Sequence, residues 1–403
     1  MKPVVIIGGG ISGITAALEL SEAGKEVILV EKEAWLGGNV VRMHNYFPKL
    51  CPPACGLEIN FRRIRSNPRI KVLTHTTVTG IEGEKGNFHV TVRTGPRMVS
   101  DMCTSCGDCV DVCPEERPDA FNYNFGTTRA IYLPHALAYP QVFNIDTEVC
   151  KGSACAKCVS ACTYDAIDLN ATVVEETLEA HAVVSATGWK HYDAGKIEGL
   201  NYLSSPDIVT NVEFERLLSL TGPGKGKLAK PSDGSEPRKI AFVQCAGSRD
   251  ENHLPYCSAV CCSASLKHAL NVAELNKENS ATIFYIDLRV TGRNEDFLAK
   301  VEQNSRINLV KGKVAKIEAG GEGLVVIAED ITSGKKVHEN FDLVVLATGI
   351  VPNSGPAKFS VNKDGFLTGD QDAGLRAAAC ARKPMDVSAS VKDATAAALA
   401  IMK

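Results

Sequence analysis

Short apolar runs alternate with polar turns at the start of the chain. Residues 3–7 form an apolar run that predicts a buried strand, and residues 8–13 follow it as a glycine-rich turn. Residues 14–23 carry alanine and leucine at helical spacing, and residues 26–31 return to an apolar strand. This order of strand, turn, helix and strand is typical of a doubly wound α/β unit.

Similar patterns recur further along the chain. They predict strands within residues 70–94, an apolar strand over residues 177–188, and strands of a second α/β unit at residues 239–243 and 281–287. Residues 343–349 repeat the Ala-Thr-Gly ending of residues 186–188, which suggests internal pseudo-symmetry. We expect a surface loop or linker at residues 222–237 and an alanine-rich helix at residues 393–402.

Composition narrows the classes of function. The chain has 403 residues and a net charge of −3, so its charge does not favour binding to nucleic acid. No apolar run approaches the ~20 residues needed to span a bilayer, and the first strand begins so early that no signal peptide is expected. Fifteen cysteines without a secretion signal indicate metal or redox chemistry in a reducing compartment, by default the cytoplasm.

The glycine-rich turn has the spacing of a dinucleotide-binding fingerprint. Gly8 permits the tight turn, Gly10 lets the backbone approach a pyrophosphate, and Gly13 lets the helix pack close to the strand. The N-terminus of the following helix offers free N–H groups to phosphate. Glu31 ends the second strand, where it is placed to bind a ribose hydroxyl.

A second glycine turn favours FAD over NAD. Residues 36–39, Leu-Gly-Gly-Asn, follow the second strand and resemble the pyrophosphate-binding turn of flavoproteins with two dinucleotide-binding domains. No glycine fingerprint follows the strand at residues 239–243, which argues against NAD(P)H there. Besides the three fingerprint glycines, the residues expected to contact FAD are Ile11, Ser12, Glu31, Lys32, Gly37, Gly38, Asn39, Val78, Thr187, Gly188 and Gly349.

Two cysteine runs have ferredoxin spacing. They read Cys103-x2-Cys106-x2-Cys109-x3-Cys113-Pro and Cys150-x4-Cys155-x2-Cys158-x3-Cys162-Thr. In two-cluster ferredoxins, the fourth cysteine of a run crosses to the other cluster. We therefore predict one [4Fe–4S] cluster on Cys103, Cys106, Cys109 and Cys162, and a second on Cys150, Cys155, Cys158 and Cys113. The x4 spacing and the threonine depart from the pattern, and zinc is the less favoured alternative.

A third cysteine set lies where the second α/β unit would carry its glycine turn. It consists of Cys245, Cys257, Cys261 and Cys262. Three interpretations stay open, with a third cluster ranked first. The second is a group of buried free thiols, because free cysteine is among the most buried residue types. The third is a redox-active thiol pair.

The remaining cysteines and the histidines give weaker signals. Three interpretations of Cys51 and Cys55 stay open: extra cluster ligands, a redox pair, or inert thiols of a proline-stiffened loop. Cys380 is expected to be structural. His44 and His253 lie near cysteines in the sequence, but we expect polar loop residues rather than metal ligands.

Several of these motifs together resemble the A subunit of heterodisulfide reductases. The resemblance is carried by the fingerprint at residues 8–13, the inserted cysteine runs, Ala-Thr-Gly-Trp at 186–189, the third cysteine set with its flanks at 245–249 and 255–262, and Lys-Pro-Met-Asp at 383–386. It covers nearly the whole chain. It implies an α/β flavoprotein with two dinucleotide-binding domains, similar to thioredoxin reductase, and an inserted ferredoxin domain. It also implies that Asp386 lies at the flavin, beside the start of a helix near residue 387.

The resemblance also implies how the chain is divided. The FAD-binding domain comprises residues 1–98, 169–204 and 346–403. Residues 99–168 form the inserted ferredoxin-like domain with two [4Fe–4S] clusters, and residues 205–345 form a second Rossmann-like domain that carries the third cysteine set.

The function implied is electron transfer between FAD and the clusters. The chain ends at Lys403, without the second C-terminal ferredoxin domain of long family members, and so most resembles the A subunits of the quinone-interacting membrane-bound oxidoreductases of sulfate reducers. That resemblance implies two partners, a second subunit with flavin and iron–sulfur clusters and a membrane subunit with haem. It implies electron exchange between menaquinone and adenylylsulfate reductase, and a cytoplasmic position held at the membrane by the partners.

Two competing hypotheses remain. One is a stand-alone flavin-dependent NAD(P)H or disulfide reductase that uses a cysteine pair. The other is a cofactor-bearing scaffold whose flavin lies off the electron path. Under the leading hypothesis FAD exchanges electrons in pairs and the clusters singly, and no catalytic acid or base is expected. Whether electrons bifurcate or confurcate stays open.

Overall fold

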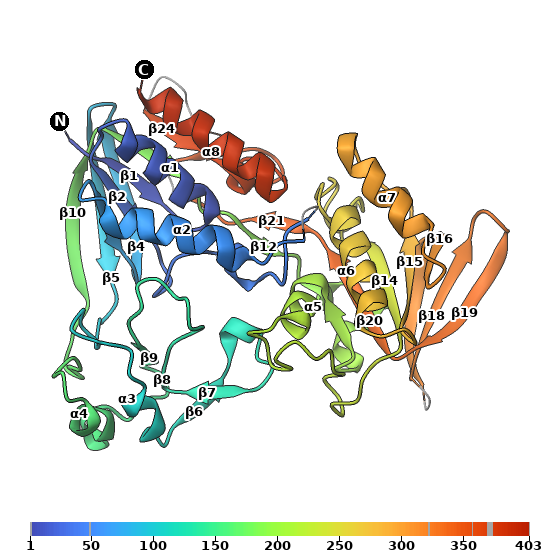
Figure 1. Ribbon diagram of the computed structural model, residues 1–403. Coiled ribbons are helices and arrows are strands. Elements are labelled where there is room, and N and C mark those ends of the chain that lie inside the picture. The colour runs from blue at the N-terminus through green and yellow to red at the C-terminus, as the bar shows by residue number, and fades with distance from the viewer. Residues whose placement is uncertain (1, 48–49, 321–322, 357, 369–373, 403) are drawn as a thin grey trace.

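The computed structural model describes residues 2–47, 50–320, 323–356, 358–368 and 374–402. Two α/β units lie side by side, and a third, smaller part formed by residues 99–168 extends from the first unit toward the second (Figure 1).

The first unit is built on a five-stranded parallel sheet. Its strand order is β24-β11-β1-β2-β3, with bounds β1 Val4–Ile7, β2 Val27–Val30, β3 Ile70–Leu73, β11 Ala182–Ser185 and β24 Leu375–Ala377. Its helices are α1 Ile11–Glu22, α2 Pro53–Ser66 and α8 Val387–Met402. The apolar residues of α1 are buried against the sheet and α8, as the helical spacing predicts.

An antiparallel sheet covers the other face of the first unit. It consists of β4 Thr76–Glu84, β5 Asn87–Thr94 and β10 Val174–Ala180, in the order β10-β5-β4. Phe88, Val90 and Val92 alternate along β5 and are fully buried against the parallel sheet, so the period-two pattern is confirmed. The single strand predicted over residues 177–188 is wrong: the chain breaks at His181 into β10 and β11, which belong to different sheets.

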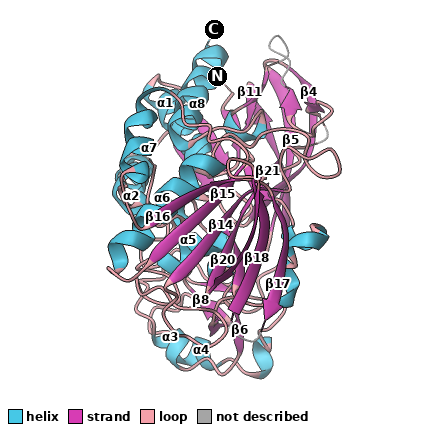
Figure 2. Cartoon of the chain, turned by 90° about the vertical axis from the view of Figure 1, so that its right-hand side faces the viewer, coloured by secondary structure: helices cyan, strands magenta, loops and turns pink. Residues whose placement is uncertain are grey.

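The second unit repeats this plan. Its parallel sheet has the order β13-β20-β14-β15-β16, with bounds β13 Ile208–Thr210, β14 Lys239–Ala246, β15 Ser280–Tyr285, β16 Ile307–Lys311 and β20 Leu343–Thr348. Its helices are α5 Asn211–Leu218, α6 Cys261–Leu275 and α7 Glu295–Glu302. The antiparallel sheet beside it contains β17 Val314–Gly320, β18 Gly323–Asp330 and β19 Lys335–Phe341 (Figure 2).

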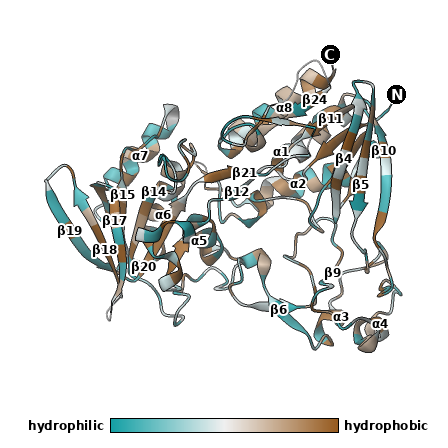
Figure 3. Cartoon of the chain, turned by 180° about the vertical axis from the view of Figure 1, so that it is seen from behind, coloured by the Kyte–Doolittle hydropathy of each residue, from teal (hydrophilic) through white to brown (hydrophobic). Residues whose placement is uncertain are grey.

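The predicted pseudo-symmetry is visible in the strand orders. The strand that ends in Ala-Thr-Gly is the second strand of both parallel sheets, β11 in one and β20 in the other. Hydrophobic positions gather along the central strands β14 and β20, whereas β19 at the outer edge is hydrophilic (Figure 3). The predicted boundary at residues 345/346 falls inside β20, and the loop at residues 222–237 connects α5 to β14 within the second unit.

A short antiparallel pair joins the two units. It consists of β12 Trp189–His191 and β21 Ile350–Pro352. Each strand follows directly after one of the Ala-Thr-Gly strand ends, so the chain crosses between the units twice at the same place. Outside it lie the strands β22 Ser360–Val361 and β23 Leu367–Thr368 of the first unit.

Residues 99–168 form an insertion between β5 and β10. Its two ends pair with each other through an antiparallel bridge between Val99 and Ile167. Its elements are α3 Asp108–Asp111, β6 Glu116–Pro118, β7 Thr127–Arg129, β8 Ile131–Tyr132, β9 Asn144–Ile145 and α4 Lys157–Ala161. A small core of its own includes six cysteine side chains, packed with Val99, Ile131, Phe143 and Ile145.

The described residues also contain eight single-turn 3-10 helices. They are η1 Val40–Arg42, η2 Ala120–Asn122, η3 Gly152–Ala154, η4 Ala194–Lys196, η5 Glu198–Leu200, η6 Tyr202–Ser204, η7 Gly292–Asn294 and η8 Ala379–Ala381. Among the described residues, no helix has both the length and the apolar character needed to cross a bilayer.

One buried guanidinium connects the insertion to both units. Arg216 of α5 is fully buried and donates to Asn122 Oδ1 of the insertion at 2.8 Å and to the Arg42 carbonyl of the first unit at 3.1 Å. It also donates to the Thr221 carbonyl at 2.7 Å, and its guanidinium carbon lies 4.8 Å from the ring centre of Phe121. Burial lowers the pKa of Arg216 to about 10, so the guanidinium stays charged at neutral pH.

We expect Arg216→Met to loosen the insertion. The substitution keeps most of the volume but leaves three buried oxygen acceptors without a donor, which should cost about 3 kcal/mol of unfolding free energy. Urea unfolding and limited proteolysis of residues 115–148 would measure the effect. Arg382→Met, which removes a half-exposed ion pair to Asp393, is the control and should change little. Equal behaviour of the two variants would contradict this role of Arg216.

Candidate functional site: a dinucleotide cavity beside three cysteine sets

A cavity of about 720 Å³ opens between the first and second units. The first unit contributes the loops after β1, β2 and β11, the segment at residues 353–356 and the start of α8. The second unit contributes residues of α5 and α6. The insertion contributes Tyr123. The cavity thus lies beyond the carboxyl ends of the parallel strands, where doubly wound sheets bind ligands.

Two glycine turns form one wall of the cavity. Gly8 has a φ of +106°, and a Cβ there would lie 2.4 Å from the Ala186 carbonyl oxygen. A Cβ on Gly13 would lie 1.8 Å from the Gly8 carbonyl oxygen, so α1 can approach β1 only with glycine at this position. Gly38 is equally tight, because its Cβ would lie 2.9 Å from the Cα of Gly10. The two turns therefore pack directly on each other.

The start of α1 is open toward this wall. Gly10 is its N-cap, and no side chain caps the helix. A Cβ on Gly10 would have 3.8 Å to its nearest neighbour, so the position is open rather than crowded. Free N–H groups of a twelve-residue helix, beside a glycine that leaves room, suit the pyrophosphate of a dinucleotide.

Glu31 has partners on both carboxylate oxygens. Oε2 accepts from the Gly9 N–H at 2.5 Å, and Oε1 accepts from the Glu33 N–H at 2.8 Å. Burial raises the pKa of Glu31, and the two backbone N–H donors oppose this rise. Each oxygen keeps a further lone pair, so Glu31 can still accept from a ribose hydroxyl while it holds the glycine turn.

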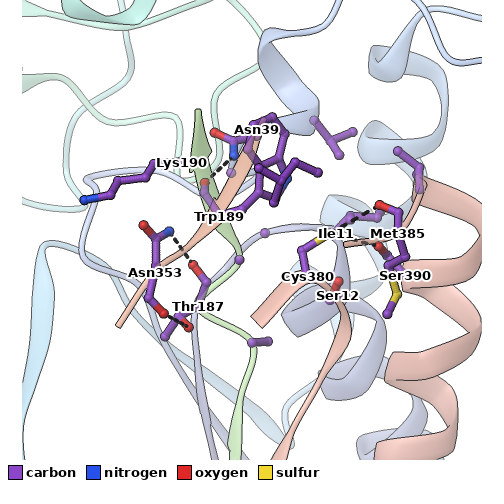
Figure 4. Close-up of a pocket in the computed structure, with 18 of the residues that line it drawn as sticks. Ile11, Ser12, Asn39, Thr187, Trp189, Lys190, Asn353, Cys380, Met385 and Ser390 are labelled. Carbon is purple, nitrogen blue, oxygen red and sulfur yellow. Dashed lines mark hydrogen bonds between the residues drawn. The ribbon is translucent and has the colours of Figure 1, made fainter. Parts of the chain in front are cut away.

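Side-chain amides tie the far end of the cavity together (Figure 4). Asn39 Nδ2 donates to the Trp189 carbonyl at 2.7 Å and so links the second glycine turn to β12. Asn353 Nδ2 donates to the Thr187 carbonyl at 2.8 Å, and Thr187 Oγ1 donates back to the Asn353 carbonyl at 3.3 Å. The residues before and after the crossing strands are therefore fixed to one another.

Most of the residues predicted from the sequence to contact FAD line the cavity. They are Gly8, Gly10, Ile11, Ser12, Glu31, Lys32, Gly38, Asn39, Val78, Thr187, Gly188 and Asp386. Gly13 and Gly37 lie behind the wall and act through packing.

Gly349 differs from the other residues predicted to contact FAD. It does not line the cavity, and a Cβ there would lie 2.2 Å from Ser248 Oγ and 2.9 Å from Ser258 Oγ. The reason is pseudo-symmetry. Gly349 follows β20 as Gly188 follows β11, so it faces the ligand position of the second unit instead of the first.

Asp386 has a structural role that the sequence did not reveal. Its Oδ1 accepts from the Ala389 N–H at 2.7 Å and its carbonyl from the Ser390 N–H at 2.8 Å, so it caps α8. Part of the positive end of this helix is therefore already neutralised by a carboxylate. Cys380 lies close by and lines the cavity, with its thiol directed to the Met385 carbonyl at 3.3 Å.

A buried charged pair at the cavity was also missed. Lys267 and Glu215 line the cavity from α6 and α5 and form an ion pair. Lys267 Nζ also donates to the Asn45 carbonyl at 3.0 Å, and the His44 N–H donates to Glu215 Oε2 at 2.8 Å. No clear signal was available, because Lys267 has polar neighbours in the sequence, among them Ser265, His268 and Asn271.

Asn45 supplies a direct test of fit for a polar cofactor. Its side chain lines the cavity and is 7% exposed, and its Oδ1 has no hydrogen-bond partner. A buried polar atom without a partner is costly unless a ligand satisfies it. The glycine cradle, the open helix end and Asn45 together fit a dinucleotide with a polar ring system.

The first cysteine group predicted from the sequence lies together in the insertion. Cys103, Cys106, Cys109 and Cys162 line one small cavity, beside Phe143 and Ala166. Burial, with Cys103 and Cys106 nearby, raises the pKa of Cys109 to about 12. The Ala166 N–H donates to Cys162 Sγ at 3.5 Å.

The second group is adjacent. Burial raises the pKa of Cys158, and Cys150 and Cys113 are close enough to raise it further. The Gly152 N–H donates to Cys150 Sγ at 3.4 Å, and Cys155 lies just before α4. Cys113 of the first run is therefore beside the second run, and Cys162 of the second run is beside the first.

The two cysteine loops of the insertion have matching backbone. Gly107 precedes α3 with a φ of +100°, and Ala156 precedes α4 with a φ of +46°. Each lies two residues before a cysteine of a short helix, Cys109 in one and Cys158 in the other. A left-handed residue other than glycine is strained and persists where the surroundings over-determine it, often at functional sites.

The third cysteine set occupies the ligand position of the second unit. Cys245 lies at a register shift in β14 with a φ of +56°, and Cys261 and Cys262 begin α6. Cys261 Sγ lies 3.7 Å from the Thr348 carbonyl, at the end of β20. Burial raises the pKa of Cys261, and the other three cysteines are close enough to raise it further. All four therefore lie together.

No three His, Cys, Asp or Glu side chains of the described ranges surround one point as around a single metal ion. A cubane cluster does not require this, because each thiolate binds a different iron. Cys51 and Cys55 are exposed and flank the start of α2, away from the three sets in the sequence. His253 Nδ1 is 2.9 Å from Tyr192 Oη, as for a polar loop residue.

Comparison with known proteins identifies relatives over the whole chain. Residues 3–47 match the family model of FAD dependent oxidoreductases. The chain is 36% identical over 421 residues to the A subunit of the ferredoxin/F420H2-dependent CoB–CoM heterodisulfide reductase of Methanosarcina acetivorans, covering 100% of this chain and 53% of that protein. It is 34% identical to the iron–sulfur A subunit of the CoB–CoM heterodisulfide reductase of Methanocaldococcus jannaschii, covering 99% of this chain and 64% of that protein. The chain thus spans less than two thirds of these relatives.

Solved structures show the same fold at low identity. The thioredoxin reductase of T. acidophilum matches with a TM-score of 0.55 and 15% identity, covering 99% of this chain and 96% of that chain. The thioredoxin reductase of Lactococcus lactis matches with a TM-score of 0.54 and 13% identity, covering 100% and 98%. The prediction of a thioredoxin-reductase-like flavoprotein fold is confirmed.

Two glycine substitutions should affect FAD binding and the stability of the apoprotein separately. Gly10→Ala has room in the fold but places a methyl group where a pyrophosphate would approach, so we expect normal apoprotein stability and loss of most bound FAD. Gly13→Ala collides with the Gly8 carbonyl and should destabilise the apoprotein by roughly 3 kcal/mol. Flavin absorbance after gel filtration and urea unfolding of the apoprotein would measure the two effects. Unchanged FAD affinity in Gly10→Ala would show that the pyrophosphate lies elsewhere.

Proposed function

Over its whole length this chain is homologous to the A subunits of heterodisulfide reductases, and we propose that it passes electrons between FAD and [4Fe–4S] clusters within a multisubunit complex. It is a flavin and iron–sulfur oxidoreductase subunit. The observation that carries the proposal is that one chain combines a dinucleotide cavity with a cysteine group in the loop beside it and with two further cysteine groups in the insertion. A bound flavin exchanges electrons in pairs, whereas clusters exchange them singly.

The clusters of the insertion are assigned by the crossing of the two runs. We assign Cys103, Cys106, Cys109 and Cys162 to one cluster, since these four line the same small cavity. We assign Cys150, Cys155, Cys158 and Cys113 to the other, since Cys113 lies beside Cys158. Backbone N–H groups directed at Cys150 and Cys162 would tune the potentials of both clusters.

A third cluster is proposed on Cys245, Cys257, Cys261 and Cys262. Support comes from their close grouping, and from the strained backbone of Cys245, which turns a residue of β14 toward α6. Residues 259 and 260, within the same loop, line the dinucleotide cavity. This third set is therefore next to the flavin position.

Aromatic residues connect the insertion with the cavity. Trp35 and Tyr123 both line it, one from the first unit and one from the insertion. Trp35 packs edge-on against Tyr132 of β8, with ring centres 6.1 Å apart, and Leu133 packs against both this aromatic cluster and the cysteine-containing core. A continuous packed path therefore leads from the flavin position to the cysteines of the insertion.

We further propose the physiological partners that the sequence resemblance implies. These are a second subunit with flavin and iron–sulfur clusters and a membrane subunit with haem, which would hold this chain at the cytoplasmic face of a membrane. Electrons would be exchanged between menaquinone and adenylylsulfate reductase. Co-purification of these subunits with the native protein, and reduction of its clusters by a menaquinol analogue in that complex, would test this proposal. A complex without the haem subunit would refute it.

The cluster assignment predicts which cysteine substitutions act alike. In anaerobically purified protein we expect about twelve irons per FAD. Cys106→Ala and Cys162→Ala should remove the same electron paramagnetic resonance signal, although they lie in different runs, while Cys158→Ala and Cys113→Ala remove another. FAD should remain bound in all four. If Cys162→Ala instead resembled Cys158→Ala, each run would hold its own cluster and the crossing would be wrong.

Iron content also distinguishes the proposed electron-transfer function from the competing hypothesis of a flavin-dependent reductase. About eight irons per FAD would leave the third set as free thiols. The flavin-dependent disulfide or NAD(P)H reductase hypothesis would then be favoured, and NADH should reduce the flavin of the isolated chain.

A further inference from the structure

We propose that Arg249 and Arg289, held in place by the carboxylate of Asp287, form a charge clamp that raises the reduction potential of the cluster at the third cysteine set. The proposal rests on the proposed function, which places a cluster there. It adds three residues that are not ligands and assigns them two roles. The two arginines supply charge, and Asp287 is a positioning residue.

The clamp is built from one carboxylate and two guanidinium groups. Arg289 Nε donates to Asp287 Oδ2 at 2.9 Å, and Arg249 forms an ion pair with Asp287 Oδ1. Each oxygen of Asp287 therefore holds a different arginine. The Arg249 side chain is 24% exposed and that of Arg289 is 49% exposed, so both would be free to turn into solvent without this anchor.

Both arginines reach the cysteines. The Arg249 side chain lies close enough to Cys245, and the Arg289 side chain close enough to Cys257, for each positive charge to act on the neighbouring thiol. Cys262 Sγ lies 3.7 Å from the Asp287 carbonyl, and the backbone of Arg289 is close to the same thiol. One three-residue segment, 287–289, therefore contacts the cysteine set from the end of β15, while Arg249 approaches from the loop after β14.

The loop that carries Arg249 is held in an uncommon conformation. Arg249 has a φ of +56°, in the left-handed region that few residues other than glycine adopt. Its backbone N–H donates to the Tyr256 carbonyl at 3.1 Å, and Asp250 beside it is paired with Lys313 at 2.9 Å. Strain of this kind persists where the surroundings fix it, so the position of Arg249 is specified rather than incidental.

The electrostatic consequence follows from the charges. Two guanidinium groups and one carboxylate leave a net charge of one positive unit beside the cysteines. Reduction adds an electron to a cluster, so a nearby positive charge stabilises the reduced form and raises the potential. In the insertion, the hydrogen bonds found at Cys150 and Cys162 come from neutral backbone N–H groups. The third cluster should therefore accept electrons more readily than the insertion clusters.

The test is a redox titration of the holoprotein, followed by electron paramagnetic resonance. The signal of the third cluster is first identified as the one lost in Cys261→Ala. Arg249→Met and Arg289→Met should each shift the midpoint potential of that signal to more negative values, while the insertion signals stay unchanged. Arg249→Lys retains the charge without the planar fork and should give a smaller shift. Arg63→Met removes one positive charge from a surface pair with Glu22 and should leave all potentials unchanged.

Asp287→Asn separates positioning from simple charge. Removing a negative charge beside the cluster would by itself raise the potential. If Asp287 holds the arginines, its loss lets both turn away, and the potential falls instead. A fall supports the clamp, whereas a rise shows that Asp287 acts only as a charge and overturns its positioning role.

The remaining outcomes keep the two proposals apart. About eight irons per FAD in the unsubstituted protein would overturn the third cluster and, with it, the clamp. About twelve irons with an unshifted potential in both arginine variants would overturn the clamp alone. If the Arg249→Met variant assembles no third cluster, the midpoint potential of that cluster is measured in the Arg249→Lys variant instead. A negative shift in that variant supports the clamp, and an unchanged potential overturns it.

Discussion

The buried guanidinium of Arg216 is the contact on which the arrangement of the cavity depends. It binds the insertion, the first unit and its own loop at the same time, through neutral oxygens and an aromatic ring. Tyr123, which the insertion contributes to the cavity, is the immediate neighbour of the Asn122 bound by Arg216. The insertion is therefore placed relative to the flavin position by a hydrogen-bond network with fixed geometry, which a purely apolar contact would not supply.

Glu215, which precedes Arg216 on α5, lines the cavity on the side of the second unit. Burial alone would raise the pKa of Glu215, but Lys267 and His268 outweigh it and hold this pKa well below its usual range. The carboxylate is thus ionised, and the His44 N–H of the first unit donates to it. A buried ion pair contributes little net stability compared with apolar packing, but breaking it leaves a costly unpaired charge. It therefore specifies how the two units meet.

Sequence reasoning succeeded where the signal is local. The glycines of residues 8–13 have spacing that follows from one turn, and the alternation in β5 follows from one sheet face. It failed where two distant segments decide the outcome. The break at His181 depends on a second sheet lying across the first, and the position of Gly349 depends on which unit its strand end faces. Arg216 could not be recognised, because none of its hydrogen-bond partners is a charged residue nearby in the sequence.

The pseudo-symmetry explains why one chain can hold a dinucleotide and a cysteine set at equivalent places. Both parallel sheets present the end of an Ala-Thr-Gly strand beside the loop that follows the central strand. In the first unit that loop is glycine-rich and leaves room for a pyrophosphate at a helix end. In the second unit a register shift and a left-handed Cys245 replace it, and the cysteines at the start of α6 occupy the place of the phosphates. A helix end that attracts an anionic phosphate also attracts anionic thiolates, so the cluster proposed at this place would keep the sign of the charge that the fold stabilises.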